Sequence, residues 1–303
     1  MITIRFNEIE LLVSKQLSET ELKMLRQYAA GLDSIRELLG KMYGKYGDQV
    51  TLGDMTQYNR LASIEVQLLQ EIKKLSSVSL KATSGILAQT FENSYYGTGF
   101  VLENETGLKL GFSKLNPDII KKSVENPLSK VKWQSRLKIN HDYYAQRTTN
   151  ILTDGLIKGH GFAKTAANMK EQLDSLANNT LRIVRTENHR VSNEARHLGI
   201  DRGKKAGERL GITVFKVWDA NNSKDPRKNH NDMDGQKADA DGLFTMVTAD
   251  GATIKVDKPG NTGLAGEDIN CNCFLRTEIA GLSGNPRGEY NSFDDWYTKR
   301  INK

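Results

Sequence analysis

The sequence predicts an α+β fold, with a predominantly helical N-terminal two-thirds followed by a small β-rich C-terminal module. Apolar residues recur every three to four positions up to Gly211, which is the spacing of amphipathic helices. After Gly211 the pattern changes to the alternation typical of strands. The chain's two cysteines, Cys271 and Cys273, lie one residue apart within this last part.

Residues 1–112 are expected to form a helical hairpin or small bundle. Ser18 and Glu21 have the spacing of a capping box, which favours a helix start at that point. Asp54 is expected to cap a second helix, and a third is expected over residues 79–96. The segment from Gly97 to Gly111 is expected to break the helices, with room for a short hairpin. The second helix has a near-heptad apolar stripe that indicates packing on a neighbour: Leu61, Ile64, Leu68, Ile72 and Leu75.

Residues 113–211 are expected to be helical and basic. Pro117 follows Asn116 and takes the first helical position that proline favours. The glycines of residues 159–161 separate two helices, and a long helix is expected from about Ser175 to Arg209, with Gly211 as its C-terminal cap.

Residues 212–282 are expected to form the β-rich module. Strands are predicted over residues 212–218, 243–248, 253–256 and 274–279, with a tight turn at Asp250 and Gly251. The tail, residues 283–303, carries three aromatic residues that form a candidate docking patch: Phe293, Trp296 and Tyr297.

The charge balance is mildly basic, with 43 Lys and Arg against 37 Asp and Glu. The excess is local: residues 113–140 hold seven basic residues against two acids, and residues 181–216 hold nine against four. Such stretches indicate a solvated helix face, or a contact with an acidic partner or with DNA phosphates that ignores base sequence. The start of the chain lacks the pattern of a secretory leader, and no 18-residue apolar stretch exists, so no membrane partner is expected.

The last part of the chain holds a candidate metal site. His230, Asp268, Cys271 and Cys273 supply the imidazole, carboxylate and thiolates that Zn²⁺ prefers, and an ion here would be structural. Two alternatives stay open. The cysteines could form a metal-free clamp or free thiols, or a disulfide strained by its one-residue spacing.

The sequence does not favour an enzyme. Arg185, Thr186 and Glu187 lie in the long predicted helix with Asn193, where charged residues three or four apart form ion pairs. A transferase using them would also need a nucleotide-binding loop, and the chain has no phosphate-binding loop motif. A His-metal nuclease needs a second histidine downstream, and none follows His230.

The order of these pieces over roughly residues 130–280 resembles the phage head morphogenesis or minor head protein family, which includes protein F of phage Mu. Residues 133–169 look like the family's paired helices split by a glycine turn. Residues 185–196 are similar to its Arg-Thr-Glu helix. Asn272 stands where the family usually has Arg, and many members carry a Cys-x-x-Cys at the positions of Arg227 and His230. The residues that resemble the family's closing module are Trp218, Asp225, Arg227, His230, Asp234, Gly235, Phe244, Glu267, Asn270, Cys271 and Cys273.

The resemblance implies a minor structural protein of a tailed-phage head, present in several copies per virion. Its implied partners are the portal protein, the major capsid protein and non-specific DNA, and its role is in head assembly or DNA delivery. The implied location is the virion head near the portal vertex, and the host cytoplasm during assembly. One alternative is a metal-dependent nuclease or toxin-like enzyme on a phage-type domain, and another is a host-encoded DNA-binding module.

Overall fold

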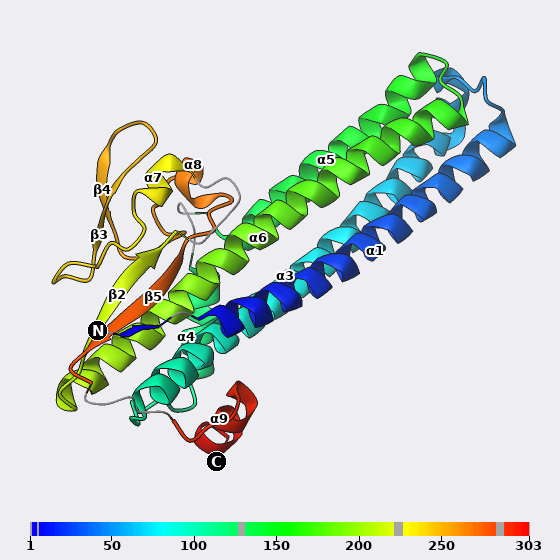
Figure 1. The fold of residues 1–303 in the computed structure, drawn as a ribbon. Helices are drawn as coiled ribbons and strands as arrows, with labels where there is room; N and C mark the ends of the chain where they lie inside the picture. The colour runs from blue at the N-terminus through cyan, green and yellow to red at the C-terminus, as the bar shows by residue number, and fades with distance from the viewer. Residues whose placement is uncertain (1, 5, 127–130, 221–226, 283–287, 303) are drawn as a thin grey trace. The chain divides into compact units, whose positions relative to one another are not determined.

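The computed structural model describes residues 2–4, 6–126, 131–220, 227–282 and 288–302. Its long helices and its few antiparallel strands near the C-terminus confirm the α+β class (Figure 1). The chain forms two compact units: unit 1 is residues 1–17, 85–131 and 185–303, and unit 2 is residues 18–84 and 132–184. The predicted domain boundaries at residues 112, 211 and 282 stay predictions.

Unit 2 is built from four long helices: α1 (Asn7–Tyr46), α3 (Arg60–Thr106), α5 (Trp133–Ile157) and α6 (Phe162–Arg209), of which α1, α3 and α6 also contribute residues to unit 1. A short helix, α2 (Leu52–Thr56), and a 3-10 turn (Gln57–Asn59) connect α1 to α3. The four helices lie side by side in unit 2 (Figure 1). Their apolar faces form its core, which includes the fully buried Ile35, Leu39, Leu68, Leu152 and Leu176.

One layer of this bundle is polar. The Tyr28 hydroxyl contacts Ser79 Oγ at 3.0 Å, His141 Nε2 at 2.9 Å and Thr180 Oγ1 at 2.9 Å, so each of the four helices contributes one residue. His141 Nδ1 lies 2.8 Å from the Leu137 carbonyl, which makes Nδ1 the donor and Nε2 the acceptor from Tyr28. Because each of these polar groups has a partner, the layer specifies which helix faces meet.

Several predicted helix boundaries are wrong. Helix α6 begins at Phe162 rather than at about Ser175, and the second and third predicted helices are one helix, α3. Helix α1 begins at Asn7 rather than at Ser18, because the buried Ile9 and Val13 continue the apolar pattern upstream. Helix α3 continues to Thr106 through Gly97 and Gly99. A Cβ atom at Gly97 would lie 2.5 Å from Ile9 Cδ1, so this glycine allows close packing instead of breaking the helix. The capping box of α2 also differs: Thr51 is the cap, and Asp54 is its partner.

Unit 1 contains the strands. The antiparallel sheet has the order β1 (Ile2–Ile4), β5 (Phe274–Ala280), β2 (Thr213–Asp219), and the register pairs Trp218 with Leu275. A hairpin of β3 (Phe244–Val247) and β4 (Thr253–Val256) follows β2 in the chain. Strand β5 alternates, with Leu275, Thr277 and Ile279 buried. The predicted strands are therefore confirmed within one or two residues.

Unit 1 also contains α4 (Pro117–Glu125), with Pro117 at its first position as predicted, α9 (Phe293–Arg300) and two short helices, α7 (Lys228–Asn231) and α8 (Ala265–Asp268). Trp296 of α9 is fully buried, and its indole N–H donates to Glu103 at 2.9 Å. The ring also packs 6.3 Å from Phe100 and Phe112. The tail aromatics thus pack largely within unit 1 instead of forming an open docking patch. Among the described residues, no helix has the length and apolar character needed to cross a membrane.

Candidate metal centre

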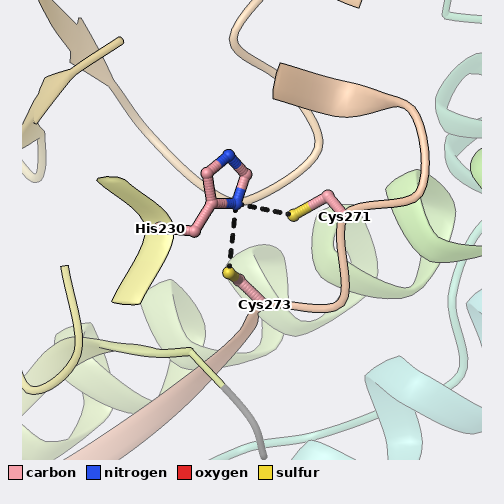
Figure 2. A group of neighbouring side chains, drawn as sticks. All are labelled: His230, Cys271 and Cys273. Atoms are coloured by element: carbon pink, nitrogen blue, oxygen red, sulfur yellow. Dashed lines mark hydrogen bonds between the residues drawn. The ribbon is translucent and has the colours of Figure 1, made fainter. Parts of the chain in front are cut away.

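His230, Cys271 and Cys273 meet in unit 1. His230 lies on the short helix α7 (Lys228–Asn231), and the cysteines lie in the segment that enters β5 (Figure 2). His230 Nδ1 is 3.5 Å from Cys271 Sγ and 3.4 Å from Cys273 Sγ. The three ligand atoms all lie within 4.8 Å of one another, and all three side chains are buried. Both cysteines are free thiols, so the geometry is that of a metal site or a metal-free clamp.

Arg227 and Asn270 shape the backbone that presents the thiols. Arg227 caps α7 and donates to the carbonyls of Glu267, at 3.0 Å, and of Ile269. It therefore binds the end of helix α8 (Ala265–Asp268), just before the first cysteine. Asn270 has φ +57°, a left-handed conformation that asparagine tolerates better than most residues. The Arg-x-x-His spacing thus places an anchor and a candidate ligand on one helical turn.

Glu267 orients the histidine. Its Oε2 accepts from His230 Nε2 at 2.8 Å and from Asn229 Nδ2 at 3.0 Å, and its Oε1 accepts from the Ala249 N–H at 2.8 Å. Burial alone would raise the pKa of Glu267, but these hydrogen bonds outweigh it and the pKa is lowered. The carboxylate holds the proton on Nε2, so the lone pair of Nδ1 faces both sulfurs. This carboxylate–histidine arrangement is typical of metal sites.

The two thiols differ in acidity. The hydrogen bond between the cysteines, followed by burial, raises the pKa of Cys271. The same hydrogen bond lowers the pKa of Cys273; burial opposes this, and the neighbouring Trp218 indole lowers the pKa further. Cys273 is therefore the thiol that more readily becomes a thiolate, the form that binds metal.

Helix α6 holds the second cysteine in place through Asn193. The side-chain amide Nδ2 donates to the Cys273 carbonyl at 3.1 Å, and Oδ1 accepts from the Leu275 N–H at 3.2 Å. Asn193 thereby pairs with the start of β5 as a neighbouring strand would. One turn further along α6, the buried Arg196 donates to Glu10 at 2.9 Å, and its guanidinium lies 4.5 Å from the Phe274 ring centroid.

The Arg-Thr-Glu segment lies on α6, where two of its three side chains are buried. Glu187 is fully buried and pairs with Arg190 at 2.8 Å. Arg190 also donates to the carbonyls of Ser123 and Val124, both at 3.1 Å, near the end of α4. Thr186 is buried in α6, while Arg185 is exposed.

Other predicted site residues lie around the cluster. Trp218 is fully buried and packs edge-on to Phe244, with ring centroids 5.3 Å apart. Gly235 has φ +77°, and its N–H donates to the Trp218 carbonyl at 2.9 Å, which closes the turn onto β2. Asp268 is buried but lies outside the group of three ligand atoms. Asp225 lies outside the described residues.

The resemblance includes Asn193, but neither its clamp on β5 nor the role of Asn229 was predictable from the sequence. Both act through residues distant in sequence: Asn229 on Glu267, and Asn193 on Cys273 and Leu275. No spacing rule links either residue to the partners that it contacts, so only the fold reveals these contacts.

Comparison with known proteins agrees with the resemblance. Residues 146–276 match the family described as phage Mu protein F like protein. The chain is 26% identical over 277 residues to the minor head protein GP7 of Bacillus phage SPP1. The alignment covers 90% of this chain and 87% of that protein.

A second relative carries an enzyme name. The chain is 29% identical over 303 residues to the NAD(+)--arginine ADP-ribosyltransferase EFV of Enterococcus faecalis (strain ATCC 700802 / V583). The alignment covers 97% of this chain but only 60% of the length of that relative. No solved structure matches the chain. The family match and the SPP1 relative together support the resemblance to the phage Mu protein F-like family and to phage minor head proteins.

Proposed function

We propose that the chain is a minor structural protein of a tailed-phage head that binds at the portal or capsid vertex and acts in head assembly or DNA delivery. The observation that carries this proposal is the burial of the family-motif residues Glu187, Asn193 and Trp218, each with no exposed surface. Residues enclosed in this way stabilise a rigid body and cannot bind an external substrate. The name of the SPP1 relative, a minor head protein, supports the same role.

Helix α5 supplies the docking surface in this proposal. Ile139, Tyr143 and Ile157 are 64%, 51% and 61% exposed, and their spacing of four and fourteen residues places them on one face of the helix. Exposed apolar side chains at both ends of this face suit a protein partner, for which we propose the portal protein, with the major capsid protein as a further contact.

Co-expression with the portal protein of the same phage, followed by size-exclusion chromatography, tests this surface. The double substitution Ile139→Ser and Tyr143→Ser is expected to abolish co-elution. The matched control, Leu22→Ser with Leu25→Ser, removes exposed apolar side chains from α1 and is expected to leave co-elution intact. Loss of co-elution in the control alone would show that α5 is not the docking helix.

A DNA contact is proposed at α4 and the segment just before it. Lys114, Lys121 and Lys122 are exposed, whereas Arg190 and Arg196 of the second basic stretch are buried and serve the fold. Replacing the three lysines with Gln should lower the affinity for duplex DNA equally for all sequences. For every phosphate that a lysine no longer neutralises, the salt-dependence slope should fall by about 0.9. An unchanged slope would remove DNA from the proposed partners.

A structural Zn²⁺ is the cofactor in this proposal. Two sulfurs and one imidazole nitrogen form a soft donor set of the kind Zn²⁺ prefers, and Glu267 already orients the imidazole. When bound, the ion would supply only cross-linking, because the site is buried. Elemental analysis of the full chain, purified without chelators, should find one zinc per protein.

The chain itself is proposed to have no enzymatic activity, and the activity named for the Enterococcus relative is proposed to belong to the portion of that protein that this chain does not span. Incubation with labelled NAD⁺ and an arginine-containing acceptor should leave the acceptor unlabelled. Incubation of plasmid DNA with divalent metals should give no nicks. Labelling or nicking that disappears in His230→Ala or Glu187→Ala, in variants shown to fold, would establish the alternative.

A further inference from the structure

A pocket of about 410 Å³ lies in unit 1 and shares no lining residue with the candidate metal centre. One wall is a face of α6, on which His197, Asp201 and Lys204 recur every three or four residues. Strand β2 contributes Lys216, and the loop before β3 and the residue after β4 complete the lining. Small-molecule pockets occupy about 300–1,000 Å³, so this one has room for a small organic compound.

Lys216 brings a buried amine to this pocket. The residue is 7% exposed, and its Nζ donates to the Asp257 carbonyl at 2.9 Å and to His197 Nδ1 at 3.1 Å. The neighbouring buried Lys258 differs, because its Nζ contacts the carboxylates of Glu194, at 3.0 Å, and of Asp257. Buried charges are normally paired in this way. Lys258 therefore has the environment of an ammonium, whereas the two acceptors of Lys216 are uncharged groups.

The surroundings of Lys216 favour its uncharged form. Burial lowers the pKa of Lys216 below its ordinary value. The carboxylates of Asp201 and Asp257 oppose this, and the charges of Lys258 and Lys204 add to it. A lower pKa increases the share of uncharged amine at neutral pH, and the uncharged amine is the nucleophilic form of lysine.

His197 is placed to accept a proton from this amine. Its Nε2 lies 3.5 Å from Asp201 Oδ2, one turn further along α6. The carboxylate favours the ring proton on Nε2, so the lone pair of Nδ1 faces Lys216. Burial, followed by the charge of Lys216, lowers the pKa of His197 below its ordinary 6.5, which keeps the imidazole free to take a proton. Lysine, histidine and aspartate thus stand in the order of nucleophile, base and orienting group.

The hydrogen bonds of Nζ determine which part of the amine the pocket meets. An uncharged amine has two protons and one lone pair, and the Asp257 carbonyl and His197 Nδ1 take the two protons. The lone pair is left for a group in the pocket. Space beside Nζ is available at Gly242, which also lines the pocket and where a Cβ atom would be 3.8 Å from Nζ.

We propose that Lys216 is a covalent modification site for small aldehydes or ketones, with His197 as its base and Asp201 as a positioning residue. The Nζ lone pair forms a bond to the carbonyl carbon, and one Nζ proton passes to His197 Nδ1. That proton then moves to the carbonyl oxygen, which gives a carbinolamine. Loss of its hydroxyl with the remaining Nζ proton, as water, gives an imine, so no oxidant or reductant is needed. This capture modifies the chain once without turnover, and it goes beyond the proposed structural role.

Incubation of the full chain with pyridoxal at pH 7, followed by borohydride reduction and peptide mass spectrometry, measures the reaction of each lysine. Lys216 should be labelled at least about 10-fold faster than Lys205, which lines the same pocket but is exposed. A positioned base contributes about 100-fold, and we expect restricted access to offset part of that gain. Lys258, which is buried and ion-paired, is the negative control.

Substitutions on α6 test the roles of the two neighbours. His197→Asn keeps a hydrogen-bonding group but removes the base, so it should slow labelling of Lys216 about 10-fold or more and leave Lys205 unchanged. Asp201→Asn should also slow it, whereas Asp241→Asn, which removes another carboxylate of the pocket lining, should not.

Slower labelling of Lys216 than of Lys205 in the wild-type chain is the result of a purely structural lysine and would overturn the modification site. Equal rates at Lys216 in the wild type and in both the His197 and Asp201 variants would overturn the assignment of base and positioning residue. Neither result changes portal co-elution, which tests the head-protein function separately.

Discussion

Replacement of Asn193 by Ala should destabilise the start of strand β5 more than any substitution of an exposed residue. The side chain is fully buried, and it pairs the Leu275 N–H and the Cys273 carbonyl, at 3.2 and 3.1 Å. Alanine leaves both backbone groups without that partner. At about 1–3 kcal/mol for each of the two unpaired buried groups, the expected loss is about 2–6 kcal/mol.

Hydrogen exchange of the segment 271–280 is the appropriate assay, because it reports local opening without assuming that the two units unfold together. The Leu275 amide should exchange faster by a factor of about 30 or more, which corresponds to about 2 kcal/mol. Asn150→Ala, at an exposed position of α5, is the control and should change stability by less than about 0.5 kcal/mol. Exchange at Leu275 within a factor of two of wild type would refute the clamp.

Three further predictions concern other parts of the chain. Arg190→Met should cost about 3–5 kcal/mol in urea unfolding because it removes the guanidinium that pairs with the buried Glu187 carboxylate, whereas adding Glu187→Gln to the same chain should restore much of the loss; a double variant no more stable than the single one would count against this pair. Asn270→Val should cost about 1–2 kcal/mol and Asn270→Gly much less, because φ is +57°; equal melting temperatures would show that the turn relaxes. Burial lowers the pKa of His141 below its ordinary 6.5, so the unfolded chain binds the proton more readily and stability should fall as pH drops below about 6.5; a His141→Gln chain with the same pH slope would exclude this histidine as the cause.

Periodicity predicted the parts of the fold that depend on local sequence. The change of pattern after Gly211, the turn between α5 and α6 and the strands of unit 1 all follow from it. The ends of α1 and α3 do not, because Ser18 carries a cap signal inside a helix and Gly97 looks like a breaker. At both positions tertiary packing outweighs the local signal: the buried Ile9 extends α1 and lies against Gly97 of α3.

The candidate site was predictable in its residue types but not in its arrangement. The chain has only two cysteines, and its last histidine precedes them, which identified His230, Cys271 and Cys273 as the candidate ligands. The orienting role of Glu267 and the clamp by Asn193 depend on contacts across 37 and 80 residues of sequence, which no spacing rule encodes.

Quantitative mass spectrometry of purified phage particles tests the central claim most directly. The particles should contain this chain at a fixed ratio of a few copies per portal ring, far below the major capsid protein, and heads separated from tails should retain it. Particles that lack the chain, while infected cells contain it, would contradict a role as a structural component of the head.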